Sequence, residues 1–86
     1  MIDAEKLPSA IYALHGIILK ARIMAYEGAS NARLAGLLDA AEMLPRLIAN
    51  KSDETLRFRQ YVDEISSEYD CKFVLQRFDN PVPVEW

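Results

Sequence analysis

Three side chains that could bind a ligand share one stripe of a predicted helix near the start of the sequence. His15, Arg22 and Tyr26 are spaced by seven and four residues, and such spacings place residues on the same side of an α-helix. Arg22 would donate two parallel hydrogen bonds to a carboxylate or phosphate, and Tyr26 would add a hydroxyl group. The stripe is therefore a candidate binding site for a small anionic ligand.

A second interpretation is that the same stripe borders a protein interface. Tyrosine and arginine are enriched at interfaces, where a histidine often only hydrogen-bonds to a neighbour. The contact surface would then be an apolar stripe on the same helix, formed by Tyr12, Leu19, Ile23 and Tyr26. We favour the interface and keep the anion site as the alternative.

The sequence offers no set of side chains for catalysis or for a metal ion. One histidine, His15, and one cysteine, Cys71, are too few for a structural zinc site or an internal disulfide. No nucleophile–base pair can be assembled from them, so we expect no enzymatic activity, no metal and no cofactor. We expect Cys71 to be a buried small residue, and carboxylates such as Asp39 and Glu42 to lie on solvated helix faces.

The composition indicates one globular domain, residues 1–86, with 51% apolar and 27% charged residues. The net charge of −3 argues against nucleic acid as a partner. The longest apolar run, Ile17-Ile18-Leu19, is far too short to cross a membrane. The free cysteine and the lack of a signal-peptide pattern predict a cytoplasmic location. Composition and helix order are similar to those of many small bacterial proteins, and no motif points to a particular family.

Helices must position these residues, because apolar side chains recur at three- and four-residue spacing along most of the chain. We predict an all-α fold, a small bundle of three main helices followed by a short C-terminal helix or extended segment. The expected main helices are 8–27, 32–49 with a kink or break near Pro45, and 53–69. Gly28 should end the first helix, and Ser30 or Asn31 should cap the second.

The last part of the chain is less clearly patterned. Residues 71–78 match a helical spacing and also the alternation of a strand, and we favour a short helix. Residues 79–86 contain Pro81 and Pro83, so they should form an extended tail.

The first helix is apolar on nearly all sides, which predicts that more than one neighbour covers it. The expected core side is a seam with alternating four- and three-residue spacing: Leu7, Ile11, Leu14, Ile18, Ala21 and Ala25. Four further apolar residues widen this seam on one flank: Ala10, Ala13, Ile17 and Met24. The other two main helices cannot also cover the opposite side, which contains the Tyr12, Leu19, Ile23 and Tyr26 stripe. We expect a second copy of the chain, the C-terminal segment through Phe73, Phe78 and Trp86, or both together to cover it.

The second copy is favoured, because a small domain has little core of its own and two-fold dimers are the commonest soluble assembly. The predicted function is a protein–protein interaction module, of adaptor or regulatory kind, that forms a homodimer and also binds another protein. The alternative is a small anionic-ligand-binding domain that uses His15, Arg22 and Tyr26.

Overall fold

The computed structural model describes residues 4–49 and 54–84, and within them the chain forms four α-helices and no strand. The helices are α1 (Leu7–Tyr26), α2 (Asn31–Ile48), α3 (Thr55–Tyr69) and α4 (Phe73–Asp79). The all-α prediction is confirmed, and the ambiguous segment 71–78 contains a helix. The predicted start of the third helix, residue 53, lies outside the described residues.

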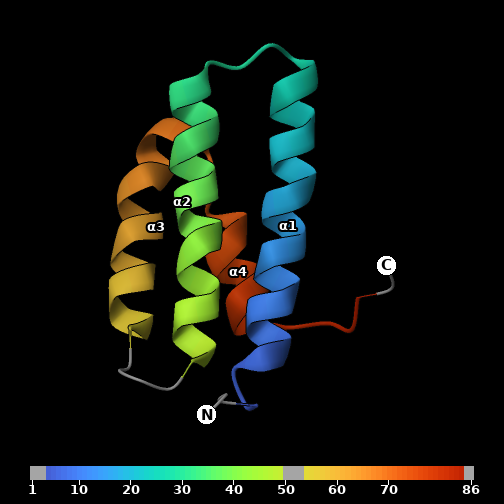
Figure 1. Ribbon diagram of the computed structural model, residues 1–86, viewed down its shortest axis with the longest axis vertical. Helices are drawn as coiled ribbons and strands as arrows, with labels where there is room; N and C mark the ends of the chain where they lie inside the picture. Colours follow the sequence, from blue (N-terminus) through green and yellow to red (C-terminus); the bar gives the residue numbers. More distant parts are fainter. Residues whose placement is uncertain (1–3, 50–53, 85–86) are drawn as a thin grey trace.

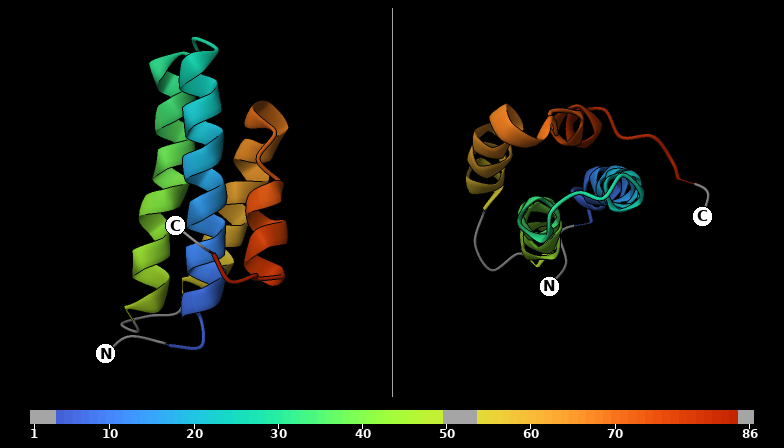
Figure 2. Two further views of the ribbon diagram at one scale, coloured as in Figure 1. Left: turned by 90° about the vertical axis from the view of Figure 1, so that its right-hand side faces the viewer. Right: turned by 90° about the horizontal axis from the view of Figure 1, so that it is seen from above.

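The helices are arranged in two layers (Figures 1 and 2). Antiparallel α1 and α2 form one layer, and α3 and α4 form a second layer on one side of it. α1 packs against α2 and α4, while α3 packs against α2 and makes a smaller contact with α4. The short α4 lies beside the amino-terminal half of α1, so the carboxy-terminal half of α1 extends beyond it (Figure 1).

The turn between α1 and α2 follows the expected rules for helix ends. Gly28 has a φ of 78°, a left-handed conformation that favours glycine. The N–H of Ala29 donates to the carbonyl of Met24 at 2.9 Å and closes the last turn of α1. The Ser30 hydroxyl accepts a hydrogen bond from the N–H of Arg33 at 3.3 Å, which caps α2. The sequence predictions for both helix ends are confirmed.

The core lies between the two layers and draws on all four helices. Its largest fully buried side chains are Phe58, Ile17, Leu37, Leu44, Leu47, Val62, Val74 and Cys71. The rings of Phe58 and Phe78 pack with their centroids 5.4 Å apart, which joins α3 to α4. The Cys71 thiol lies 3.5 Å from the Ser66 hydroxyl, so this cysteine is the buried small residue that the sequence predicted.

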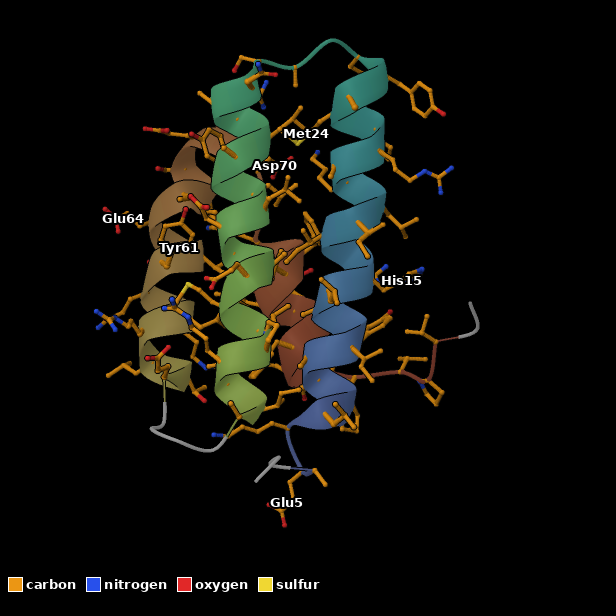
Figure 3. The ribbon with its side chains drawn as sticks, in the orientation of Figure 1. Glu5, His15, Met24, Tyr61, Glu64 and Asp70 are labelled. Atoms are coloured by element: carbon orange, nitrogen blue, oxygen red, sulfur yellow. The ribbon has the colours of Figure 1, made fainter. Side chains whose placement is uncertain are left out.

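The buried side of α1 lies on one flank of the predicted seam. Its buried residues are Ala10, Ala13, Gly16, Ile17 and Met24, and all of them except Gly16 belong to the flank that the sequence predicted. Leu14 and Ala21 of the seam are half-buried against the core, whereas Ile18 is 38% exposed, so the predicted centre of the seam was wrong. The reason is that both α2 and α4 pack on α1. The buried side of α1 is therefore turned by about a third of a helical turn from the centre of the predicted seam. Figure 3 shows Met24 on the side of α1 that is turned toward α2.

Pro45 does not interrupt α2, which runs from Asn31 to Ile48 as one helix. The predicted break near Pro45 is therefore absent, and the kink that was its alternative stays a prediction. The proline lies in the last turn, where its missing N–H removes only one helical hydrogen bond. The N–H of Ala49 still donates to the carbonyl of Pro45 at 3.1 Å and completes the end of the helix.

Gly36 lets two tyrosines of α3 approach the backbone of α2. The hydroxyl of Tyr61 donates to the carbonyl of Gly36 at 3.1 Å. A Cβ atom on Gly36 would lie 2.5 Å from a ring carbon of Tyr69, closer than van der Waals contact allows. The guanidinium of Arg33 covers the same Tyr69 ring, 5.9 Å from its centroid. The absence of a side chain at position 36 therefore sets the spacing of α2 and α3.

We expect Gly36→Ala to lower the free energy of unfolding by about 1–3 kcal/mol, because the added methyl group overpacks the contact with Tyr69. Helix propensity alone would favour alanine by about 1 kcal/mol. Urea unfolding measures the difference in the free energy of unfolding between the two proteins. In a Tyr69→Leu background, Gly36→Ala should become neutral or stabilising. A stabilising Gly36→Ala with Tyr69 in place would contradict the described packing.

A second prediction concerns alkaline pH. Burial raises the pKa of the Tyr61 phenol, and the negative charge of Asp39 adds to this effect. Because the unfolded phenol has a pKa of about 10, the stabilising contribution is complete below that pH and is lost as the pH rises through the folded pKa. We expect the free energy of unfolding to fall above about pH 10, and to fall less steeply in Tyr61→Phe. Equal alkaline slopes for the two proteins, measured by urea unfolding, would contradict the prediction.

Candidate functional site

Three exposed large side chains form a strip on the carboxy-terminal half of α1. Leu19, Ile23 and Tyr26 are 37%, 51% and 86% exposed, and we call them the outer strip of α1. This half of the helix lies beyond the end of α4, so no element of the described residues reaches across it (Figures 1 and 2). Three of the four predicted interface residues are thus brought together on an open surface.

The fourth predicted interface residue, Tyr12, is separated from the outer strip and covered by α4. The guanidinium carbon of Arg77 lies 4.2 Å from the centroid of the Tyr12 ring, within the range of a cation–π interaction. Arg77 Nη1 also donates to the carbonyl of Tyr12 at 3.2 Å. Tyr12 therefore contributes to holding α4 on α1.

Arg77 can cross α1 because the helix has a glycine at the crossing point. A Cβ atom on Gly16 would lie 2.5 Å from Cδ of Arg77 and 2.7 Å from its Nε. Arg77 Nη1 then reaches Nδ1 of His15 at 3.3 Å. We call Tyr12, His15, Gly16 and Arg77 the Arg77 cluster. Sequence reasoning missed Arg77, although a glycine in the middle of a helix was a signal of close packing.

The residues of the predicted anion site are placed in two different environments. His15 is half-buried in the Arg77 cluster, on the side of α1 turned away from α2 (Figure 3). Arg22 and Tyr26 are exposed, and Arg22 lies seven residues, or about 10 Å along the helix, from His15. An anion bound by Arg22 and Tyr26 would thus lie in solvent beside the outer strip. The anion site stays a prediction.

The described residues hold no group of three or more His, Cys, Asp or Glu side chains that could bind a metal ion. None of their helices is both long enough and apolar enough to cross a membrane. Asp39 and Glu42 are exposed on α2, as predicted, and Glu42 forms an ion pair with Arg46 at 3.3 Å.

One ion pair joins the two helices of the second layer. Arg59 of α3 pairs with both carboxylate oxygens of Asp79 at the end of α4, with Nη1 to Oδ2 at 3.1 Å. The hydrogen bond from Arg59 lowers the pKa of Asp79, and the guanidinium lies 5.4 Å from the Phe78 ring centroid. This ion pair holds α3 and α4 together. Neither of its residues belongs to the outer strip of α1.

No protein-family model, no curated protein and no solved structure matches this chain. Its function must therefore be inferred from its own surfaces.

The residues after α4 form an apolar groove with the start of α1. The groove has a volume of about 540 Å³ and is lined by Leu7, Pro8, Ile11 and residues 81–84. Phe78 packs in the core on Phe58, and Trp86 lies outside the described residues. The described part of the C-terminal segment thus lies near the amino end of α1 and leaves the outer strip open.

We expect Arg77→Met to lower the free energy of unfolding by about 1–2 kcal/mol, because it removes the stacking on Tyr12 and the hydrogen bond to the Tyr12 carbonyl. Arg77→Lys should not restore the loss, since lysine has no planar group to stack on the ring. Arg57→Met, a change at an exposed arginine of α3, is the matched control and should be nearly neutral. Equal stabilities of the Arg77→Met and Arg57→Met proteins in urea would show that the Arg77 cluster does not hold α4.

Proposed function

We propose that this chain is a protein–protein interaction module, of adaptor or regulatory kind, that acts as a homodimer in the cytoplasm, where the Cys71 thiol stays reduced. The observation that carries the interaction module is the exposure of the outer strip of α1, where Leu19, Ile23 and Tyr26 reach 37%, 51% and 86%. Adjacent large apolar and aromatic side chains exposed on one helix are typical of a contact surface.

The residues around the strip indicate the chemistry of the protein that it would bind. α1 contains Lys20 and Arg22 and no acidic residue. Tyrosine and arginine are the residue types that most often anchor protein interfaces. The best fit is a partner surface with an apolar centre that receives Ile23 and Tyr26 and an acidic edge that faces Arg22.

The strip is also held in a fixed position before any partner binds. Met24 is buried one residue after Ile23, and the capped turn at Gly28 follows directly after the helix. A side chain on a rigid helix loses less conformational entropy on binding than one on a loop. This supports recognition by the preformed helix face.

One observation favours the alternative function, binding of a small anion by His15, Arg22 and Tyr26. His15 meets a further arginine, Arg77, at 3.3 Å, which adds positive charge to this side of α1. The two functions are separated by a titration with inorganic phosphate followed by NMR. Saturable shifts at Arg22 and Tyr26 that are lost in Arg22→Ala would favour the anion site, and the absence of such shifts would favour the interaction module.

The interaction module is tested by affinity capture from the native cell extract with wild-type protein and two matched variants. Ile23→Glu places a charge in the outer strip, and we expect it to reduce the captured partner by about tenfold or more. Leu56→Glu alters a side chain of α3 that is 67% exposed, and it should capture the same partner as the wild type. Circular dichroism confirms that both variants fold. Equal capture by the wild type and Ile23→Glu would contradict the proposal.

A further inference from the structure

A second apolar surface lies on the side of the α1/α2 layer that α3 and α4 do not cover. Its ten residues are all apolar and are half-buried or exposed: Ile11, Leu14, Ile18, Ala21 and Ala25 of α1, and Leu34, Leu38, Ala41, Pro45 and Ile48 of α2. We call it the α1/α2 face. Five of these residues belong to the seam that the sequence predicted to be in the core.

We propose that the α1/α2 face binds the same face of a second copy, so that α1 and α2 of two chains form an antiparallel four-helix core. The inference rests on the homodimer of the proposed function and assigns the surface that makes it. It leaves the outer strip of α1 free for a different protein.

The shape of the α1/α2 face is self-complementary, because it has a protruding part and a hollow. Ile18 and Leu38 protrude from it, with 38% and 50% exposure. They lie at nearly the same height, since each is about two turns from the loop that joins the antiparallel helices. About two turns further along lies a hollow of about 80 Å³, lined only by apolar residues: Leu7, Ala10, Ile11, Leu14, Leu44, Pro45 and Ile48.

A two-fold rotation that reverses the direction of the helices brings these two features together. The axis would pass between the protruding residues and the hollow, at the level of Leu14 on α1 and Glu42 on α2. Ile18 and Leu38 of each chain then meet the hollow of the other chain. Such a contact is isologous, because each chain uses the same surface and both contacts form at once.

The area of the α1/α2 face reaches the size of a specific interface. A surface two helices wide and 18 residues long measures about 20 by 27 Å, so two copies bury more than about 1,000 Å². Specific interfaces begin at about that size. The outer strip is one helix wide and covers only residues 19–26, or about 10 by 12 Å, so it can anchor one part of a partner interface but cannot by itself hold two copies together.

Sedimentation equilibrium of the full chain tests the proposal. At about 100 μM protein we expect the wild type to have twice the 9.8 kDa mass of the chain. Leu38→Lys should raise the dissociation constant at least about 100-fold, because it would bury a charge without a partner. Ile23→Lys in the outer strip and Leu56→Lys on α3 are matched controls and should remain dimers.

The outcomes separate this inference from the proposed homodimer. A wild type of single-chain mass would overturn both. A dimer that Ile23→Lys dissociates and Leu38→Lys leaves intact would overturn the α1/α2 face and keep the homodimer. Loss of the dimer in Leu38→Lys alone, with an unchanged circular dichroism spectrum, would support the α1/α2 face.

Leu38→Ala gives a second test that applies even if Leu38→Lys fails to fold. It shortens the protruding side chain without introducing a charge, so it should raise the dissociation constant by about tenfold or more. An unchanged dissociation constant in Leu38→Ala would overturn the α1/α2 face.

Discussion

The contact between α4 and α1 determines which surfaces of this chain remain in water. Arg77 crosses α1 at Gly16, stacks on Tyr12 and reaches His15, and this fixes α4 beside the amino-terminal half of α1. With seven residues, α4 is too short to follow α1 to its end. Because α3 also lies on the α4 side, neither of these two helices covers the other side of the α1/α2 layer (Figure 2). The position of α4 on α1 thus leaves two apolar surfaces exposed.

These surfaces differ in size and chemistry, and this difference underlies the proposed division of roles. The α1/α2 face is wide, almost free of charge and complementary to itself, which suits a second copy of the chain. The outer strip of α1 is narrow, contains a highly exposed tyrosine and lies beside Arg22, which suits a distinct partner. Dimerisation through the first surface would present two outer strips on one particle, and paired sites can raise the apparent affinity for a partner that reaches both.

Much of the fold could be predicted from local patterns in the sequence. Helical spacing gave the all-α class, and the end of α1 at Gly28 and the cap at Ser30 follow from residue chemistry within a few positions. The burial of Cys71 was also predicted. The break at Pro45 was not found, because the proline falls in the last turn, and a spacing pattern locates a helix better than it locates its last residue.

The position of the buried side of α1 was predicted only in part, because the flank of Ala10, Ala13, Ile17 and Met24 is buried but the centre of the predicted seam is not. It depends on Arg77, which lies 65 residues after the Tyr12 carbonyl that it contacts. The seam through Ile18 had the right spacing for packing, but spacing alone does not show which neighbour a seam meets. All residues of the seam except Leu7 belong to the α1/α2 face, for which we propose a contact between chains. Of the candidate site, the C-terminal segment was one of the expected covers of the apolar stripe, and it covers Tyr12 through Arg77, a residue that the sequence analysis did not name. It leaves Leu19, Ile23 and Tyr26 exposed.

The central claim is that a second copy completes the α1/α2 layer. An isotope-filtered NMR experiment on a mixture of labelled and unlabelled chains tests it most directly, because it detects only contacts between chains. The account predicts cross-peaks from the Leu38 methyl groups of one chain to Pro45 and Ile48 of the other. Cross-peaks between chains that involve only Leu19, Ile23 or Tyr26, or none at all, would contradict it.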